Sequence, residues 1–394
     1  MKPLVGIKVL DLTHAISGPT CTAMLRQLGA EVIKVEPPKV GDDFRHYTEH
    51  AGLPGMSIPF AAVNAGKKSI TLNLKSDEGR KIALELAADA DIFVENFRPG
   101  VIARLGLGYD NLRAVNQRII ALSLSGFGQS GPLRDWGAYD HIAQAVSGMA
   151  MMNANESGPL KVGMPIVDSF SGYLGVIAIL AALRHRDLTG VGEYLDVAML
   201  DAALKLIGTS VSVWSYTGES PKGTGNRGYR LVATAEFYPT GDGWIALGAN
   251  HQHQIEALFR AFGHPEMIAD PRFRDHPARV ENYEALRAWL IDYLAGRRAE
   301  DLEVELTSVG VPAAMIRDIG QVASHPHLQQ RGLLENAILS GTGDRLQVVG
   351  PGFEVDEEPT ATVVPALGEH TEQVLSSIGY KGAEIARLRQ ERVI

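Results

Sequence analysis

Short apolar segments alternate with helical patterns through the first 125 residues, and this alternation constrains the fold more than any other feature of the chain. Ser76 or Asp77 is expected to cap the helix that follows the third segment. Strands joined by helices form βαβ units with parallel strands and right-handed crossovers. We therefore predict an α/β fold with a Rossmann-like large domain built on a parallel sheet. The predicted strands cover residues 8–12, 31–35, 69–74, 92–94 and 119–124.

The rest of the chain predicts a second, smaller domain. A long helix is expected over residues 169–186, buried between layers because it is apolar nearly all round. Thr240-Gly241-Asp242-Gly243 predicts a hairpin, and three helical patterns follow it. Residues 321–351 are expected to be irregular and to lead into two closing helices near 370–390. The predicted domains are a large domain (1–216, rejoined by 330–394), a linker (217–231), a small α+β domain (232–315) and a return linker (316–329).

Charge and cysteine content exclude several classes of partner and compartment. Lys and Arg total 37 against 46 Asp and Glu, a net charge of −9, which argues against a nucleic-acid or anionic-membrane partner but allows a local basic pocket. Cys21 is the one cysteine, so no internal disulfide forms and a reducing compartment is expected. The apolar run 173–183 is shorter than the ~18 residues of a membrane span. No signal peptide is recognised, so we expect a cytoplasmic protein without a membrane partner.

General catalytic and metal-binding signatures are missing from the sequence. There is no Walker A loop, no Gly-x-Ser-x-Gly elbow and no His-Glu-x-x-His. The glycine spacing at 223–228 resembles a dinucleotide fingerprint, but it follows no predicted strand and opens no predicted helix. The close histidine pairs, His251 with His253 and His325 with His327, have no cysteine or carboxylate at zinc-site spacing. We therefore expect no metal site and no tightly bound cofactor.

Asp168 is the strongest single candidate for chemistry. An apolar run ends in this carboxylate at the point where the long helix is expected to begin. It could simply be the N-cap of that helix, a position that aspartate favours. It could instead be a carboxylate that the N–H groups of the helix hold ionised, and such a group in a closed site can act as a nucleophile.

Several strings, taken together in their order and spacing, resemble the family III CoA-transferases, the group that contains formyl-CoA:oxalate and carnitine CoA-transferases. Any one of these strings alone is a weak signal. The resemblance extends over nearly the whole chain. The matching segments are 6–13, 18–19, 28–36, 64–69, 94–100, Tyr139-Asp140 with Ala143-Gln144, Asp168, and 270–273.

The resemblance implies a fold, an assembly and a mechanism. Members of the family form interlocked homodimers of chains with a Rossmann-like large domain and a small domain. By similarity, Asp168 attacks the donor acyl-CoA to form a mixed anhydride, and CoA then converts this anhydride to an aspartyl-CoA thioester. An acceptor carboxylic acid reverses the steps. Coenzyme A and acyl-CoA are thus substrates of the predicted enzyme.

The resemblance also implies binding residues. Without it, Lys75 and Arg104 could be solvated charges at helix ends, Asn96 a turn residue and Phe97 a core side chain. For the acyl group it nominates Gly248, Ala249, Asn250 and His251, where some relatives carry a run of glycines. For CoA it nominates Ser17, Leu72, Asn73, Leu74, Lys75, Asn96, Phe97, Arg98, Arg104, Tyr139 and Asp140.

Two departures bear on the substrate. Ile16 stands where some members carry glutamine, and the glycine run is replaced, so formyl and oxalyl groups are disfavoured. Asn250 and His251 could bind the distal carboxylate of a longer acyl group. A small dicarboxylate such as succinate, itaconate, mesaconate or citramalate is the expected acceptor, and transfer within one dicarboxylyl-CoA stays open.

Three other functions are alternatives to CoA transfer for this chain. An α-methylacyl-CoA racemase would need a histidine base where Tyr139 stands, and His141 lies two positions late. Tyrosine, with a pKa of ~10, is badly matched to removing an α-proton near neutral pH. A non-catalytic acyl-CoA-binding protein would use Asp168 only as a cap. An NAD enzyme is disfavoured because the first βα turn holds only Gly18.

Overall fold

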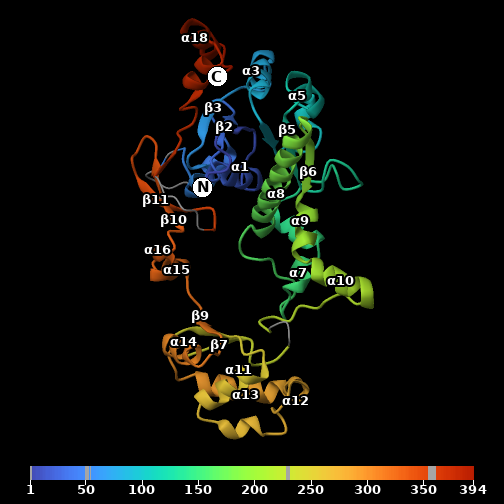
Figure 1. Cartoon of the computed structure of the whole chain (residues 1–394), viewed down its shortest axis with the longest axis vertical. Coiled ribbons are helices and arrows are strands. Elements are labelled where there is room, and N and C mark those ends of the chain that lie inside the picture. The colour runs from blue at the N-terminus through green and yellow to red at the C-terminus, as the bar shows by residue number, and fades with distance from the viewer. Residues whose placement is uncertain (1, 49–52, 54, 228–230, 354–360) are drawn as a thin grey trace. The chain divides into compact units, whose positions relative to one another are not determined.

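A computed structural model describes residues 2–48, 53, 55–227, 231–353 and 361–394 (Figure 1). The chain divides into two compact units. Unit 1 comprises residues 1–150, 161–220 and 326–394, and unit 2 comprises residues 151–160 and 221–325. The segment 151–160 thus groups with unit 2, whereas the sequence prediction counted it with the large domain.

A six-stranded parallel sheet forms the centre of unit 1, in the order β3-β2-β1-β4-β5-β6. The predicted parallel sheet is therefore confirmed. The strand order reverses between β1 and β4, and in open α/β sheets ligands bind at the carboxyl ends of the strands beside such a reversal. The strands are β1 Lys8–Asp11, β2 Glu31–Glu36, β3 Lys68–Thr71, β4 Ile92–Glu95, β5 Ile120–Ser125 and β6 Tyr194–Ala198.

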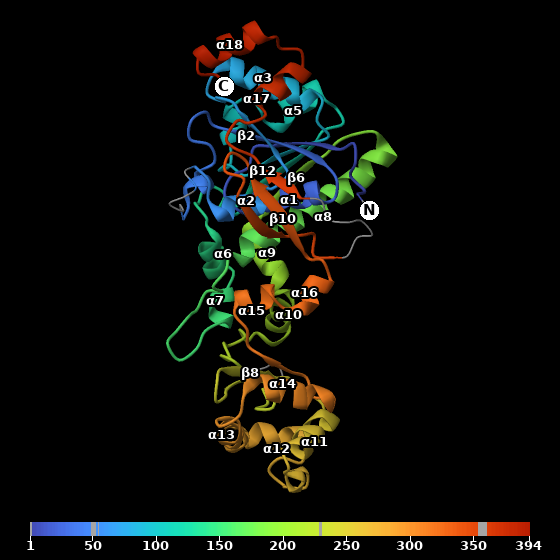
Figure 2. The same ribbon diagram turned by 90° about the vertical axis from the view of Figure 1, so that its left-hand side faces the viewer.

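Helices cover both faces of this sheet. On one face, α1 (Ser17–Gln27) and α8 (Ile166–Thr189) pack on the apolar side chains of β1, β4 and β5. The other face carries α3 (Asp77–Ala88), α5 (Tyr109–Val115), α17 (Thr371–Ser377) and α18 (Gly382–Gln390), which lie close together in Figure 2 and share one core. The expected cap of α3 is present, since the Ser76 hydroxyl accepts from the N–H of Gly79.

Shorter helices complete unit 1 and the segments that lead into it. They lie in the segments that connect successive strands. Their bounds are η1 Asp43–His46, α2 Ile58–Asn64, α4 Val101–Arg104, α6 Asp140–Val146, α7 Met149–Met152, α9 Met199–Leu206, α10 Gly208–Thr217, α15 Ile319–Ala323 and α16 Pro326–Gln330.

The long helix differs from its prediction in extent and in burial. α8 begins three residues earlier and ends three residues later than expected. It is not buried all round, because Tyr173, Ile177, Leu180 and Leu188 are exposed. Its length and composition alone would also suit a membrane span. Its buried residues, however, pack on the sheet and on α1, as those of a core helix do.

The segment expected to be irregular, 321–351, contains regular structure. Strands β10 (Leu334–Leu339) and β11 (Arg345–Val349) pair antiparallel, and β12 (Thr362–Val364) pairs parallel with β10. The prediction was wrong because contacts with distant residues stabilise these strands. Their buried side chains pack against Phe44 and Phe60.

Unit 2 is built on the predicted hairpin. Strands β7 (Phe237–Pro239) and β8 (Trp244–Leu247) flank the turn, and β9 (Ala313–Met315) pairs with β8. Helices pack on this small sheet around a core of its own. They are α11 Gln252–Ala261, η2 Pro265–Ile268, α12 His276–Glu281, α13 Tyr283–Leu294 and α14 Ala299–Ser308.

Candidate active site

A buried ionic network supports the carboxyl ends of β1 and β2. The Lys67 ammonium lies 3.0 Å from the carboxylate of Asp11, which also accepts hydrogen bonds from the hydroxyls of Thr13 (2.5 Å) and Thr22 (2.6 Å). Lys34 donates to the carbonyl of Thr13 at 2.6 Å. Although burial opposes ionisation, the charges of Lys67 and Lys34 lower the pKa of Asp11 to about 2. The network fixes the turn between β1 and α1, and its members lie in or beside the strings that carry the family resemblance.

Asn96 joins the two loops that meet where the strand order reverses. Its side-chain oxygen accepts from the N–H of His14 at 2.8 Å, and its amide donates to the carbonyl of His14 at 2.8 Å and to the Ser17 hydroxyl at 3.4 Å. The Phe97 ring lies 5.4 Å from that of His14. The structure therefore brings together Ser17, Asn96 and Phe97, three of the residues predicted to bind CoA.

Glu95, directly before this loop, was not singled out from the sequence. It ends β4, and its carboxyl group accepts from the N–H of Phe97 at 2.8 Å. Burial raises the pKa of Glu95 to about 7, against the effect of its hydrogen bonds to Ser123 and Phe97. A buried side chain at the end of an apolar strand carries no sequence signal that separates it from a core residue.

Three arginines gather beside the turn between β4 and α4. A Cβ placed on Gly100 would lie 3.1 Å from Arg104 Nη1 and 3.6 Å from Arg134 Nη2. A Cβ placed on Gly137 would lie 3.4 Å from Arg98 Nη2. All three arginines are exposed, and none forms a salt bridge with a residue that the structure describes. Unpaired cations close together in a chain of net charge −9 are suited to bind phosphate groups.

Arg134 was missed by the sequence analysis. It lies in a loop before α6, in a stretch with no periodic pattern, and its significance depends on its closeness to Arg104 beside Gly100. Only a folded chain shows that closeness.

The predicted CoA-binding stretch after β3 contributes less side-chain surface than expected. Leu72 is 1% exposed and packs in the core of unit 1, so its side chain is not available to a ligand. The Asn73 side chain accepts from the N–H of Lys75, and Leu74 packs partly buried against the same core. Lys75 is exposed. Of these four residues, Lys75 presents a charge to solvent.

Asp168 occupies the first turn of α8 and is not the cap of that helix. Pro165 holds the cap position. The carboxylate of Asp140 instead accepts from the N–H groups of Val167 (2.7 Å) and Asp168 (3.2 Å). The Asp168 carboxylate forms no hydrogen bond with the described residues. Both expectations for Asp168, as a cap and as a carboxylate held by helix N–H groups, are therefore wrong.

The electrostatic surroundings of Asp168 oppose its ionisation. Burial raises its pKa to about 7, and the negative charge of Asp140 adds to the effect. Gly172, one turn later, packs so closely on α1 that a Cβ there would lie 2.5 Å from the Ser17 carbonyl oxygen. Asp168 therefore lies at the end of α8 that adjoins the start of α1, near the loops that Asn96 joins.

The remaining CoA candidates, Tyr139 and Asp140, have different surroundings. Tyr139 is 70% exposed, and its ring stacks on that of His141. Asp140 is half-buried and faces the protein, where it caps α8. The structure thus gives Asp140 a place beside the predicted nucleophile.

The acyl-site candidates belong to unit 2. Ala249 is fully buried, and its backbone pairs with Thr234, so its side chain is not available to a substrate. Gly248 packs against Pro312. The Asn250 amide donates to the Gly248 carbonyl at 3.3 Å, and His251 is exposed at the start of α11. Asn250 and His251 are thus the members of this group that offer polar side chains.

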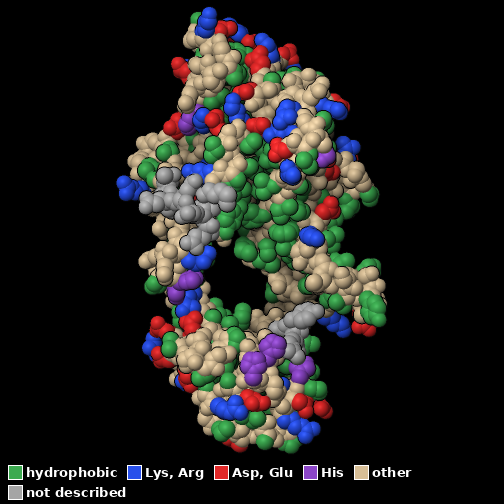
Figure 3. Space-filling model, viewed as in Figure 1, with side chains coloured by type: hydrophobic (Ala, Val, Ile, Leu, Met, Phe, Trp, Pro, Cys, Tyr) green, Lys and Arg blue, Asp and Glu red, His purple; other side chains and the backbone are tan. Residues whose placement is uncertain are grey.

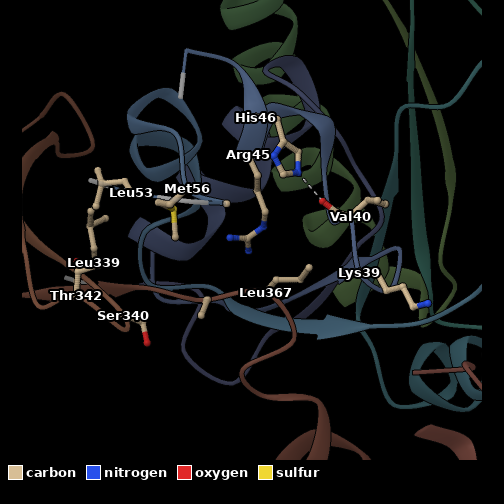
Figure 4. A pocket seen from close by; sticks show the side chains of 12 residues that line it. Lys39, Val40, Arg45, His46, Leu53, Met56, Leu339, Ser340, Thr342 and Leu367 are labelled. Carbon is tan, nitrogen blue, oxygen red and sulfur yellow. Dashed lines mark hydrogen bonds between the residues drawn. The ribbon is translucent and has the colours of Figure 1, made fainter. Parts of the chain in front are cut away.

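A hollow of about 200 Å3 beside the end of β10 is less suited to bind CoA phosphates, because the arginine that lines it is already paired (Figure 4). Arg45, which lines it, is held at 2.7 and 2.8 Å by the carboxylate of Glu36, lies over the Phe60 ring and contacts the carbonyl of Pro365. This arginine connects the C-terminal segment to the sheet. In the described part of the chain, no group of three or more His, Cys, Asp or Glu residues is placed to hold a metal ion.

Comparison with known proteins supports the family resemblance. A family model described as CoA-transferase family III matches residues 4–371. The chain is 39% identical over 334 residues to the acetyl-CoA:oxalate CoA-transferase of Acetobacter aceti, covering 84% of this chain and 85% of that protein. It is 33% identical over 401 residues to the succinyl-CoA–D-citramalate CoA-transferase of Chloroflexus aurantiacus, covering 100% and 98%.

A solved structure agrees with these sequence matches. A CaiB/BaiF family protein from Brucella suis superposes with a TM-score of 0.86 at 31% identity, over 96% of this chain and 99% of that one. The family match covers both units. The chain therefore belongs to CoA-transferase family III and is an enzyme of the CoA-transferase class.

Proposed function

We propose that this enzyme moves CoA from an acyl-CoA donor to a small dicarboxylic acid by way of covalent intermediates on Asp168. The observation that carries the proposal is the carboxylate of Asp168 itself. It is largely desolvated, it forms no hydrogen bond with any residue that the structure describes, and it lies near the loops at which a ligand of this fold is expected. The unpaired arginines Arg98, Arg104 and Arg134 supply charge for the phosphates of CoA.

Each step of the proposed reaction exchanges one acyl bond. A carboxylate oxygen of Asp168 attacks the thioester carbonyl, which forms a mixed anhydride and releases the CoA thiolate. The thiolate then attacks the aspartyl carbonyl, so that an aspartyl-CoA thioester forms and the donor acid leaves. The acceptor carboxylate attacks the carbonyl of this thioester, which forms a second mixed anhydride and releases the CoA thiolate. The thiolate then attacks the acceptor's acyl carbonyl, so that the new acyl-CoA forms and the Asp168 carboxylate leaves. No oxidant or metal is required by this balance.

Desolvation suits Asp168 to the first step. A carboxylate in water is a weak nucleophile because its hydration must be removed before it attacks. With a pKa of about 7, Asp168 is more basic than an ordinary aspartate and is still substantially ionised near neutral pH. The protein has thus already removed part of the hydration that opposes attack.

A dicarboxylate is the proposed substrate class. Relatives carry names that include oxalate, D-citramalate and glutarate. In unit 2, Asn250 and His251 provide hydrogen-bonding side chains. We propose that they bind the distal carboxylate of a dicarboxylate longer than oxalate.

A panel of acyl-CoA donors and carboxylic acids, assayed for CoA exchange, tests the proposed substrate class. We expect succinyl-CoA with a C4 or C5 dicarboxylate to give the highest kcat/KM, and oxalate and formate to give the lowest. Preference for a monocarboxylate would contradict the class. Exchange of the α-proton of a 2-methylacyl-CoA, without CoA transfer, would favour the racemase alternative instead.

Replacing Arg134 by glutamine should raise KM for the acyl-CoA about tenfold, the effect of losing one exposed charge-assisted contact. The value of kcat should stay near that of the wild type, because Arg134 is not placed at the reacting carboxylate. Steady-state kinetics with the donor varied measure both constants. Arg345, which is also exposed, provides the matched control in Arg345→Gln. Equal KM values for the two variants would show that Arg134 does not bind the acyl-CoA.

We also propose that the enzyme is a homodimer whose interface includes α9 and α10. No residue of α10 is buried, although Val213, Trp214 and Tyr216 are large and apolar. Hydrophobic side chains gather over the neighbouring α8–α9 part of unit 1 (Figure 3). Exposed apolar surface of this extent is typical of protein interfaces.

Trp214→Arg should convert the dimer to a monomer, since a charge in the centre of an apolar interface is left unpaired. Sedimentation velocity measures the mass, and circular dichroism shows whether the variant is folded. Val5→Arg, at an exposed apolar residue elsewhere in unit 1, should leave the mass unchanged. A wild-type protein that sediments as a monomer would contradict the proposal.

A further inference from the structure

A buried glutamine connects the capping carboxylate of α8 to the segment that precedes the helix. Gln144 is fully buried on α6. Its amide nitrogen donates to Asp140 Oδ2 at 2.5 Å, and its amide oxygen accepts from the N–H of Val162 at 2.7 Å. The Gln144 side chain thus holds both the Asp140 carboxylate, which caps α8, and the loop that leads into this helix.

The other oxygen of Asp140 contacts the helix itself. Oδ1 accepts from the N–H groups of Val167 and Asp168, so the two oxygens of this carboxylate receive three hydrogen bonds. These bonds hold the carboxylate of Asp140 in one orientation. A negative charge is therefore fixed next to Asp168, in an orientation that the rotation of an unsupported aspartate would not maintain.

Few other charges lie on the elements packed against the start of α8. The first turn of α1 has no acidic residue. On α9 the titratable residues are Asp201 and Lys205, and on α6 they are Asp140 and His141. Asp140 is the charged group whose field acts on Asp168.

We propose that Gln144 is a positioning residue of the transfer site, acting through Asp140 to fix the first turn of α8 and the charge beside Asp168. The inference rests on the proposed function, in which Asp168 is the nucleophile. Glutamine is suited to this place because it donates to a carboxylate and accepts from a backbone N–H at the same time. Glutamate could only accept when ionised, and methionine can do neither.

The test is a double-mutant cycle of Gln144→Met and Asp140→Asn, with kcat and its pH dependence as readouts. Gln144→Met should lower kcat about 10- to 100-fold, the size of effect expected when a reacting group is misplaced by about 1 Å. The acidic limb of the pH profile should move to lower pH, because Asp140 is freed to turn away from Asp168. In the Asp140→Asn background, Gln144→Met should have no further effect on kcat.

Controls separate a positioning role from a loss of folding. Gln321→Met removes a glutamine from the capping box of α15 and should change neither kcat nor its pH profile. If Gln144→Met does not fold, Gln144→Glu retains an acceptor for the Val162 N–H and takes its place in the cycle. Losses of kcat that multiply in the double variant, or a single variant with wild-type kcat and pH profile, would overturn the inference. Absence of any covalent adduct on Asp168 in the wild type would overturn the proposed function instead.

Discussion

Replacing Asp168 by asparagine or alanine is expected to lower the rate of CoA transfer by at least about 10³-fold, since no covalent intermediate can then form. The transition temperature should not fall. Asp168 caps no helix, and its carboxylate forms no hydrogen bond with a described residue. Transfer kinetics and thermal unfolding measure the two properties on the same samples.

The raised pKa of Asp168 determines how stability and activity should change with pH. The folded-state pKa of about 7 lies above the ordinary value of 3.8. The free energy of unfolding therefore decreases as the pH rises between these two values, because the folded protein holds the proton more tightly than the unfolded chain does. Asp168→Asn should therefore be at least as stable as the wild type at pH 8. In the wild type, kcat/KM should fall as the pH drops through about 7, because the nucleophile becomes protonated.

A control aspartate distinguishes the two roles that the sequence left open for Asp168, helix cap and nucleophile. Asp275 does cap a helix, since its carboxylate accepts from the N–H of Ala278 at 2.9 Å. Asp275→Ala should lower the transition temperature slightly and leave the transfer rate unchanged. If Asp168→Ala behaves in the same way, Asp168 has a structural role and the proposed mechanism is wrong.

The second large effect is expected at Lys67. Lys67→Met removes the cation that is paired with the buried carboxylate of Asp11, and breaking a buried pair in this way costs about 3–5 kcal/mol. Chemical denaturation followed by circular dichroism measures the free energy of unfolding. Protein concentration must be held constant, because association stabilises the folded state.

An exposed pair provides the control. Lys81 lies 3.7 Å from Glu85 on α3, with most of its side chain in water. Lys81→Met should change the free energy of unfolding by less than about 0.5 kcal/mol. A similarly small effect for Lys67→Met would show that the buried network does not hold the turn before α1 in place.

The sequence predicted the parallel sheet because its signal is local. Strands such as β4 and β5 are short apolar runs between helical patterns, and each can be recognised without knowledge of its neighbours. Strands β10 and β12 could not be recognised, since their burial depends on Phe44 and Phe60, which lie far away in the sequence. The extra length of α8 at its start depends on Asp140, which caps the helix from 28 residues away.

The residues of the candidate site could likewise be predicted only in part from the sequence. Asp168 and Asn96 could be nominated by resemblance to a family, but the surroundings that set their chemistry could not. The spacing of Asp140 and Gln144, four residues apart on one helix, was a usable signal for a side-chain pair. No such signal exists for Arg134, because its lack of a salt-bridge partner and its distance from Arg104 are properties of the folded chain.

Trapping the covalent intermediate tests the central claim most directly. The enzyme is incubated with an active acyl-CoA donor, quenched with hydroxylamine, digested and analysed by mass spectrometry. We predict a hydroxamate on Asp168 that requires the donor and is absent from Asp168→Asn. An enzyme that transfers CoA at full rate but carries no hydroxamate or CoA adduct on Asp168 would contradict the account.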